Sequence, residues 1–455
     1  MEPDRITCWL AFFWKINYVK GLKNNGNLQS DGVHLRNRKI GEIPPVYPNG
    51  WFCLLESSQL KKGQVKHVAA LGENFAVFRL LNSFDLRRWD PHVEGHHFKI
   101  NVKTFLIHHT MKQNLPENNS QNLTKEGNVN IIDAYCPHLG ANMAEGGKVL
   151  DDGCLECPFH NWTFRGDGQC QNIPYIKKVP PTMKTKSWSC CEVNQLIFVW
   201  YHAESMSPEW YIEPILQISR DKWQYQGRNE FLINCHIQEI PENGADWAHL
   251  NPVHGRGMFG NEILPNLSHH LWSAASWTSK QSSSNSNIYN DNDYKCKNKL
   301  TNEKTETNDN DEIKNNKHRA IVNLQHDLIV CGKFSIIHLD IKAEQIGPGY
   351  VELHLNCALG PMYILQTVTP IKPLIQRVTH TFFAPLIISP YAKIVFIAEC
   401  YMFERDIAIW NHKKFQKNPC LVKEDRSILE YRRWYSQFYS SSSLKYSDSI
   451  KSLDW

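Results

Sequence analysis

Residues 136–160 read CPHLGANMAEGGKVLDDGCLECPFH, and this glycine-rich stretch holds three cysteines and two histidines. Cys136 and His138 are separated by one residue and Cys157 and His160 by two, and a proline follows each of the two cysteines. Two such turns can direct two thiolates and two imidazoles to one point, which is a ligand set suited to zinc or to an iron–sulfur centre. The stretch therefore predicts a metal site built from two loops.

The order of the ligands separates these two metals. In a Rieske [2Fe-2S] centre two cysteines hold one iron and two histidines hold the other, so each loop supplies one residue of each kind. A structural zinc finger instead keeps like ligands together, two cysteines and then two histidines. The pattern favours a [2Fe-2S] cluster over structural zinc. The predicted ligands are Cys136, His138, Cys157 and His160, with Cys154 as a bystander.

A second motif lies in residues 242–254, ENGADWAHLNPVH, where Asp246, His249 and His254 form D-x2-H-x4-H. Two histidines on a helix or helix-loop, with a carboxylate from elsewhere, make the facial triad of non-heme Fe(II) oxygenases. An ordinary helix with surface histidines is the alternative, and the cluster motif upstream disfavours it. Asp246 stands about one helical turn before His249, so its carboxylate could orient that histidine. It could also bridge to a cluster histidine of a neighbouring subunit.

The sequence pattern does not identify a single acidic residue as the third iron ligand. Residues 390–415 contain no internal glycine or proline and predict a helix, and this helix carries the segment FERDIAIW at residues 403–410. Further acidic residues lie on predicted strands. The candidates are Asp406, Glu404, Glu399, Asp340, Glu344 and Glu352.

The apolar pattern predicts an α+β chain with two main domains. Short apolar and β-branched runs within residues 43–81, 129–135 and 196–202 predict a small β-domain. A strand at 231–240 and alternating apolar residues after Ile321 predict a second sheet. The predicted organisation is an N-terminal segment 1–40, a β-domain 41–205 with an inserted loop at 82–128, a second domain 206–440, and a tail 441–455. Residues 278–318, rich in Asn, Lys, Asp and Ser, predict a disordered insertion.

Composition narrows the function classes. The chain of 455 residues has a formal charge of +4 and no dominant basic block, which argues against a nucleic-acid partner. Its 14 cysteines follow no disulfide-framework spacing, and a reducing compartment is expected. The apolar run Ile6–Trp14 is followed by Lys15 and Lys20. It is shorter than the roughly 20 residues of a spanning helix, so it is either a buried or flexible start or the inner end of a membrane anchor.

With both metal motifs, the chain resembles the Rieske non-heme iron oxygenases, and more narrowly the Neverland group of cholesterol 7-desaturases of animals. The resemblance covers about residues 40–81, 129–275 and 320–440. The stretches that carry it are CPHLGANMAEGGKV, CLECPFHNWTFRGDGQCQNIPY, PENGADWAHLNPVHG, FERDIAIWNHKKF and LVKEDRSILEYRRWYSQFY.

The resemblance implies a Rieske β-domain followed by a helix-grip catalytic domain, an antiparallel sheet with helices. It implies that Asp406 is the third ligand of a mononuclear iron, beside His249 and His254. Electrons from NAD(P)H would pass through a reductase to the cluster, and then by way of Asp246 to the iron of the next subunit in a homotrimer. O2 would be the oxidant, and cholesterol would become 7-dehydrocholesterol, an early step toward ecdysteroid-type hormones.

The resemblance also implies an intracellular, membrane-associated protein, for example of the endoplasmic reticulum, with its catalytic part facing the cytosol. The short N-terminal run and the two insertions depart from the family pattern. Residues 357–371 and 380–391 are apolar enough for the wall of a sterol pocket, and sheet core is the alternative. Rival functions are a Rieske-type steroid-ring hydroxylase, an electron-carrier Rieske protein without oxygenase activity, and a sterol-binding protein that has lost catalysis.

Overall fold

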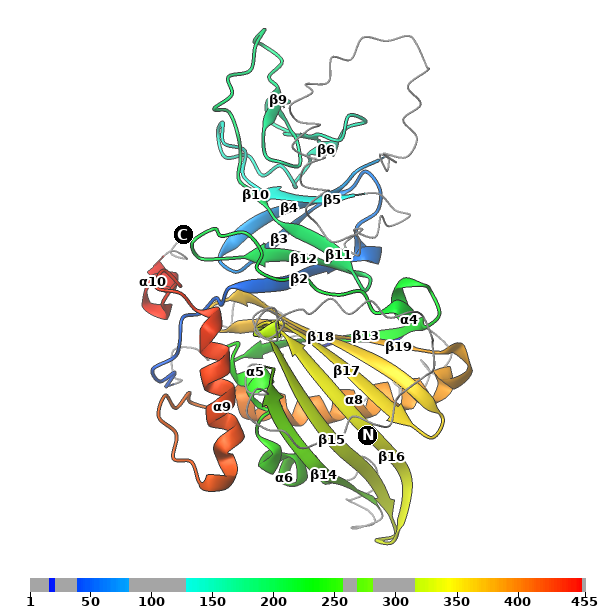
Figure 1. Cartoon of the computed structure of the whole chain (residues 1–455). Helices are drawn as coiled ribbons and strands as arrows, with labels where there is room; N and C mark the ends of the chain where they lie inside the picture. The colour runs from blue at the N-terminus through cyan, green and yellow to red at the C-terminus, as the bar shows by residue number, and fades with distance from the viewer. Residues whose placement is uncertain (1–15, 21–38, 82–127, 257–267, 281–315, 452–455) are drawn as a thin grey trace, which may run out of the picture. The chain divides into compact units, whose positions relative to one another are not determined.

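The computed structural model describes residues 16–20, 39–81, 128–256, 268–280 and 316–451 (Figure 1). The chain divides into two compact units. The smaller unit comprises Leu55–Val68 and Glu73–Phe198, and the larger unit comprises the remaining residues. The predicted anchor segment at 6–14 and the insertion at 82–127 lie outside the described residues, and the predicted boundaries at 41, 205 and 440 stay a prediction.

The smaller unit is built from short antiparallel strands. One sheet has the order β10-β5-β4-β3 and another the order β6-β7-β8-β9, while β2 pairs with β12, which also pairs with β11. Alternating apolar residues such as Phe78, Ile132 and Phe164 are buried between them and form the core. The strands of these sheets are β2 (Gly50–Glu56), β3 (Val65–Ala70), β4 (Glu73–Arg79), β5 (Val129–Asp133), β6 (Lys148–Val149), β7 (Leu155–Glu156), β8 (Thr163–Phe164), β9 (Cys170–Asn172), β10 (Ser187–Trp188), β11 (Cys190–Val193) and β12 (Leu196–Tyr201). Most of β2 and the last residues of β3 and β12 belong to the larger unit.

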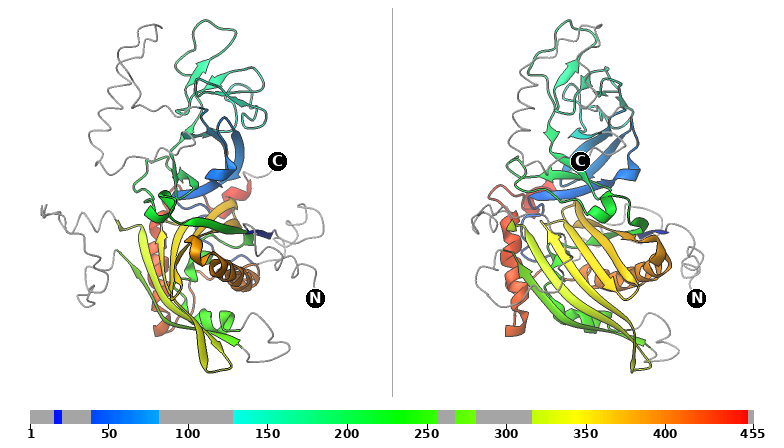
Figure 2. Two further views of the ribbon diagram at one scale, coloured as in Figure 1. Left: turned by 90° about the vertical axis from the view of Figure 1, so that its right-hand side faces the viewer. Right: turned by 45° about the vertical axis from the view of Figure 1, so that its right-hand side comes forward.

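The larger unit is built around one curved eight-stranded sheet with the order β1-β13-β19-β18-β17-β16-β15-β14 (Figure 2). All neighbours are antiparallel except β1, which pairs in parallel with β13. The N-terminal segment therefore contributes an edge strand that the sequence analysis did not predict. The strands are β1 (Ile16–Lys20), β13 (Gln224–Asn234), β14 (Ser268–Ser279), β15 (Arg319–Val330), β16 (Phe334–Ile346), β17 (Tyr350–Cys357), β18 (Gly360–Lys372) and β19 (Ile375–Ala384).

The long helix α8 (Ser389–Trp410) lies against one face of this sheet, which we call the inner face. Phe396, Cys400, Phe403 and Trp410 recur at helical spacing and are buried against β13 and β19. The other helices are η3 (Ser57–Gln59), α4 (Leu216–Ser219), α5 (Glu239–Glu242), η5 (Trp247–His249), α6 (Leu250–His254), η7 (Leu386–Ile388), η8 (Lys423–Asp425), α9 (Arg426–Tyr435), η9 (Ser436–Phe438) and α10 (Tyr446–Lys451).

The α+β class, the small β-domain and the sheet of the second domain agree with the sequence prediction, but several boundaries were wrong. The predicted strand 231–240 ends at Asn234, because the chain then turns into α5. The helix predicted to residue 415 ends at Trp410. Residues 278 and 279, placed in the disordered insertion, complete β14, while 281–315 lie outside the described residues.

One helix in the described part of the chain, Leu386–Trp410, is long and apolar enough to cross a membrane. Its apolar character has another explanation here. Phe403 packs on Phe231 of β13 with ring centroids 5.3 Å apart, and Phe396 packs on Phe382 of β19 at 4.7 Å. These contacts account for the apolar residues on the side of the helix that covers the sheet, whereas Ile387, Ile394 and Ile409 are exposed.

Candidate metal centres

Two short loops carry the predicted cluster ligands in the smaller unit. In the first loop the Cys136 amide donates to the Ala141 carbonyl (2.9 Å), and the Gly140 amide donates back to the Cys136 carbonyl (2.9 Å). Gly140 has φ +76°, a left-handed conformation that glycine adopts without a steric penalty. The loop thus turns tightly enough to bring Cys136 and His138 to the same side.

The second loop repeats this pattern. The Cys157 amide donates to the Trp162 carbonyl (2.8 Å), and the Asn161 amide donates to the Cys157 carbonyl (3.1 Å). Asn161 takes the left-handed position with φ +56°, which asparagine tolerates better than most residues. The two loops are therefore equivalent in backbone hydrogen bonding although their cysteine–histidine spacings differ by one residue.

The four predicted ligands come together at the ends of these loops. The rings of His138 and His160 lie 4.6 Å apart between centroids, and both cysteines are buried. Trp162 stacks on His138 at 4.6 Å and 6°. Nδ1 of His138 is buried without a hydrogen-bond partner among the described residues.

An apolar surrounding also acts on the thiols. Burial raises the pKa of the Cys136 thiol to about 11, so a neutral thiol is favoured until a cation replaces its proton. Two buried thiols and an orphaned imidazole nitrogen fit an iron–sulfur cluster, which would be held by Cys136, His138, Cys157 and His160.

The second predicted centre lies in the larger unit. Nε2 of His254 is 3.3 Å and Nε2 of His249 is 3.9 Å from Oδ1 of Asp406, and the three ligand atoms lie within 4.8 Å of one another. Two ligands that each lie about 2.1 Å from one ion are at most about 4.2 Å apart, so these two distances fit a shared metal. η5 and α6 supply the histidines, and α8 supplies the carboxylate.

The other candidate carboxylates have different surroundings. Glu404 lines a surface pocket with Tyr401 and Arg405, and Glu399 lies 2.6 Å from His380. Two of the three on the strands have partners away from the two histidines, Gln325 for Asp340 and Arg319 for Glu344. Glu352 lies opposite Glu344 in the register of β16 and β17. Asp406 is the one of the six that the structure brings to His249 and His254.

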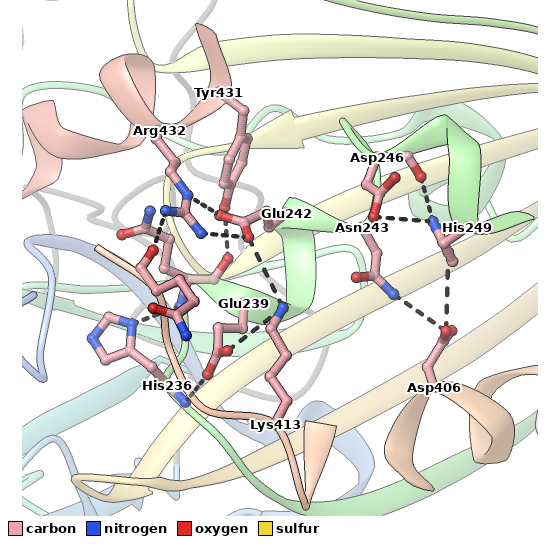
Figure 3. A network of polar contacts seen from close by, with 12 residues as sticks. His236, Glu239, Glu242, Asn243, Asp246, His249, Asp406, Lys413, Tyr431 and Arg432 are labelled. Carbon is pink, nitrogen blue, oxygen red and sulfur yellow. Dashed lines mark hydrogen bonds and ion pairs between the residues drawn. The ribbon is translucent and has the colours of Figure 1, made fainter. Parts of the chain in front are cut away.

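Asp246 lies beside His249 but its carboxylate does not make the closest contact. Nδ1 of His249 donates to the backbone carbonyl of Asp246, whereas the carboxylate is 4.0 Å from that nitrogen (Figure 3). The backbone therefore sets the orientation of His249, and the carboxylate, 34% exposed, remains available to another group.

Asn243 is a part of this centre that the sequence analysis missed. Its side-chain amide donates to Oδ1 of Asp406 at 3.2 Å, which is the oxygen that faces both histidines (Figure 3). Such a contact holds the carboxylate in one orientation. Its position three residues before Asp246, inside the same motif, was the one available signal.

A buried ionic network fixes the segment that precedes the histidines. Glu242 of α5 accepts two hydrogen bonds from Arg432 of α9, from Nε at 2.7 Å and from Nη2 at 2.9 Å. Lys413 lies 3.5 Å from Glu239, which also accepts from the His236 amide at 3.0 Å (Figure 3). Because bidentate pairs are geometrically specific, α5 is held in one position directly before Asn243 and Asp246.

Comparison with known proteins agrees with both centres. Residues 108–186 match the Rieske [2Fe-2S] domain, and residues 199–439 match the 3-ketosteroid 9alpha-hydroxylase C-terminal domain. The chain is 39% identical over 430 residues to cholesterol 7-desaturase of Drosophila melanogaster, an alignment of 92% of this chain and 81% of that one. It is 37% identical to that of Xenopus laevis, covering 95% and 81%.

A solved structure shares the fold. Pseudomonas putida CBB5 NdmA with caffeine superposes with a TM-score of 0.52 at 13% identity, covering 87% of this chain and 94% of that one. The chain is an oxidoreductase that holds a Rieske [2Fe-2S] cluster and a non-heme iron site as in its homologues. It belongs to the family of Rieske oxygenases that includes the cholesterol 7-desaturases.

Proposed function

We propose that the chain is a sterol 7-desaturase that converts cholesterol to 7-dehydrocholesterol with O2 and with electrons from NAD(P)H through a reductase. The observation that carries this proposal is the relation to cholesterol 7-desaturases over nine-tenths of the chain, together with the three-residue iron site in its catalytic unit. A site of this kind supplies O2-derived oxidising power against unactivated C–H bonds.

The residues on the inner face of the sheet are evidence in favour of an apolar substrate. Strand register places a row of aliphatic residues from β15 to β18 on the face that carries α8. Several of them, although they point inward, are only half-buried, so side chains do not fill the space in front of them completely. The half-buried members are Leu324, Leu328, Ile337, Val351 and Leu353.

The residues around the iron site have separable tasks in this proposal. His249, His254 and Asp406 hold the metal and leave positions open for O2 and substrate. Asn243 and the Asp246 carbonyl fix the orientation of two of these ligands. The Asp246 carboxylate is the proposed link to the cluster of a neighbouring subunit, which its exposure leaves possible.

The biological setting is also part of the proposal. The chain would act early in the synthesis of ecdysteroid-type hormones, as a homotrimer associated with an intracellular membrane such as the endoplasmic reticulum, with its catalytic part facing the cytosol. The support for the membrane association is chemical, because a sterol partitions into membranes. Steroid-ring hydroxylation is the second candidate, because the matched C-terminal family is that of a 3-ketosteroid hydroxylase.

Sterol analysis separates these two reactions. The full chain is expressed in cells fed cholesterol, with His249→Ala as the matched inactive control, and the extracted sterols are resolved by mass. A product lighter by two hydrogens, with a conjugated-diene ultraviolet spectrum, is expected from the wild type alone. A product heavier by one oxygen atom would instead establish the hydroxylase, and the absence of either from a chain loaded with both metals would reject cholesterol as the substrate.

A further inference from the structure

The inner face that we propose to contact the sterol is not uniformly apolar. The register of its strands carries the buried histidines His270, His326 and His380. His270 pairs with His326 on β14 and β15, and His380 of β19 pairs with the partly exposed Glu399 of α8. Ligand pockets are mostly apolar and use a small number of placed polar groups to orient the ligand. The second pair has the geometry for this task.

Glu399 lies on the same side of α8 as the predicted iron ligand. It precedes Asp406 by seven residues, and a heptad brings a helical residue back to within about 20° of the same direction. Val395 and Met402 lie on this side as well, and both are half-buried. Glu404 lies on the opposite flank, where it lines a surface pocket.

The pair is tightly held. Nδ1 of His380 is 2.6 Å from Oε1 of Glu399, and Asn229 of β13 donates from its side-chain amide to Oε2 at 2.6 Å. Phe403 packs edge-on against the His380 ring at 4.6 Å, and Phe231 does so at 6.5 Å. The imidazole is therefore fixed by a carboxylate on one side and by aromatic rings around it.

The Nε2 atom of His380 remains available to a ligand. His380 is 2% exposed, and neither of its ring nitrogens makes a hydrogen bond within the described residues; Nδ1 lies at ion-pair distance from Glu399, whereas Nε2 has no such neighbour in the described part of the chain. A buried polar atom without a partner costs free energy unless something satisfies it. A hydroxyl group fits this atom in either protonation state, because it can donate to a neutral imidazole nitrogen or accept from an N–H.

The spacing along α8 fits a sterol. Seven residues at about 1.5 Å each separate the two carboxylates by roughly 10 Å along the helix. If the carbon to be oxidised lies about 3 Å from the reacting group at the iron site, roughly 7 Å remain between that carbon and the pair of His380 and Glu399. In a sterol the 7-carbon and the 3-hydroxyl lie on adjacent fused rings, so a rigid two-ring unit spans this gap.

The rival pair at the other edge is less suited. Nδ1 of His270 and Nε2 of His326 are 2.7 Å apart and share a hydrogen bond, and the other nitrogen of each ring is buried without a partner among the described residues. The position of this pair, rather than its hydrogen bonding, argues against it. Trp272 contacts the His326 ring at 4.4 Å and the ring of the iron ligand His254 at 6.2 Å. This pair adjoins the iron site itself, where the carbon to be oxidised must lie rather than a hydroxyl one ring away.

We propose that His380 and Glu399 bind the 3-hydroxyl of the sterol and thereby place its 7-carbon at the iron. This inference rests on the proposed function and names the residues that select a hydroxylated sterol. His380 and Glu399 act here as specificity-determining residues, remote from the reacting carbon.

Competition binding tests the proposal without relying on turnover. The purified holoenzyme is titrated with fluorescent cholestatrienol, which is then displaced by cholesterol or by 3-deoxycholesterol. The wild type is expected to bind cholesterol at least about tenfold more tightly than the deoxy analogue, as for a hydrogen bond to a buried polar partner. The double variant His380→Phe/Glu399→Met replaces both partners by apolar groups and should bind the two competitors equally, with its affinity for the deoxy analogue retained.

Three further variants serve as one conservative substitution and two controls for the double variant. Glu399→Gln, which keeps the shape, should lose part of the preference. Glu404→Gln removes a carboxylate from the other flank of α8 and should keep the wild-type preference, as should His326→Phe. Cluster absorbance and iron content verify that each variant is folded.

The outcomes separate this inference from the proposed function. Equal binding of both competitors by the wild type, a preference that survives in the double variant, or a preference lost in His326→Phe would each overturn the assignment of the hydroxyl site. Failure of any sterol to displace the probe would overturn both proposals. The expected binding pattern combined with an oxygenated product would retain the hydroxyl site and reject 7-desaturation.

Discussion

At the scale of single residues, Asp406 shows what spacing can predict and what it cannot. The D-x2-H-x4-H spacing was enough to predict that His249 and His254 share a metal, because both lie within one turn-and-helix segment. Asn243 donates to Asp406 across 163 positions of sequence. No local pattern reports such a contact, so the residue that orients the carboxylate became visible only in the folded chain.

Removal of the Asn243 amide tests that role. Asn243→Ala leaves Asp406 free to rotate, and loss of a group that orients a metal ligand typically lowers metal affinity ten- to a hundredfold. We expect mononuclear iron to be lost to a chelator at correspondingly lower concentration. The cluster in the other unit is the internal control, and its visible absorbance should not change. Unaltered iron retention would show that Asp406 needs no such support.

At the scale of elements, α5 is joined to α9 by an ion pair between distant parts of the chain. Charged residues of β15, β16 and β17 interact across neighbouring strands. The apolar residues after Phe231 predict a strand as far as Ile240. The structure instead forms α5, and Glu242 pairs with Arg432, which lies 190 residues away. Apolar periodicity predicted the strands and α8 well, but it could not identify a short helix held by a distant guanidinium.

The substitution Arg432→Met measures this support. It leaves Glu242 buried without its bidentate partner, and breaking a buried pair costs about 3–5 kcal/mol of unfolding free energy. Arg426→Met is the matched control on α9, since the Arg426 side chain is 82% exposed and its pair with Glu430 contributes at most about 1 kcal/mol. Urea unfolding followed by circular dichroism compares the two, and equal midpoints would contradict a structural role for the network.

Glu352 predicts a pH dependence of stability. Burial raises its pKa from 4.5 to about 7, and Glu344, directly opposite on β16, adds to the rise. Because the pKa is higher in the folded state, folding loses stability as the pH rises from about 4.5 through 7. Glu352→Gln should therefore raise the melting temperature at pH 8 by the equivalent of roughly 3 kcal/mol and have little effect at pH 4.5.

Glu344 on the opposite strand has a lowered pKa, in contrast to Glu352. Although its burial acts to raise the pKa, Arg319 donates to its carboxylate at 2.7 Å and the net pKa is lowered. Glu344→Gln should therefore destabilise the chain at pH 8, where the pair is charged. If both substitutions shifted the melting temperature in the same direction at pH 8, the assignment of these two opposite effects would be wrong.

At the scale of the whole molecule, each compact unit carries its own predicted metal centre. The cluster ligands lie in the smaller unit and the mononuclear site lies in the larger one. Local spacing was sufficient to predict both centres because loops and turns bring their ligands together. The order of the eight-stranded sheet and the added edge strand β1 depend on pairing between distant segments, and no local pattern of residues predicts that register.

Independent centres predict separable losses of iron. A complete chain should carry three irons, two in the cluster and one at the mononuclear site. Cys136→Ser should remove the cluster pair and its visible spectrum while leaving the third iron. His249→Ala should retain the cluster spectrum and lose only the single iron, and it should abolish turnover. Joint loss of all iron in either variant would mean that the two centres fold as one.

Asp246 supplies the prediction that links the two centres. Its backbone carbonyl already accepts from His249, so Asp246→Asn should leave that ligand in place and retain both metals. If the carboxylate connects the cluster of one subunit to the iron of another, the variant should stop electron transfer between them. Stopped-flow mixing of the chemically reduced enzyme with O2 and sterol measures this, because the cluster of the variant should stay reduced while that of the wild type reoxidises. Reoxidation at the wild-type rate would place the electron path elsewhere, and loss of the mononuclear iron would instead make Asp246 a structural support of His249.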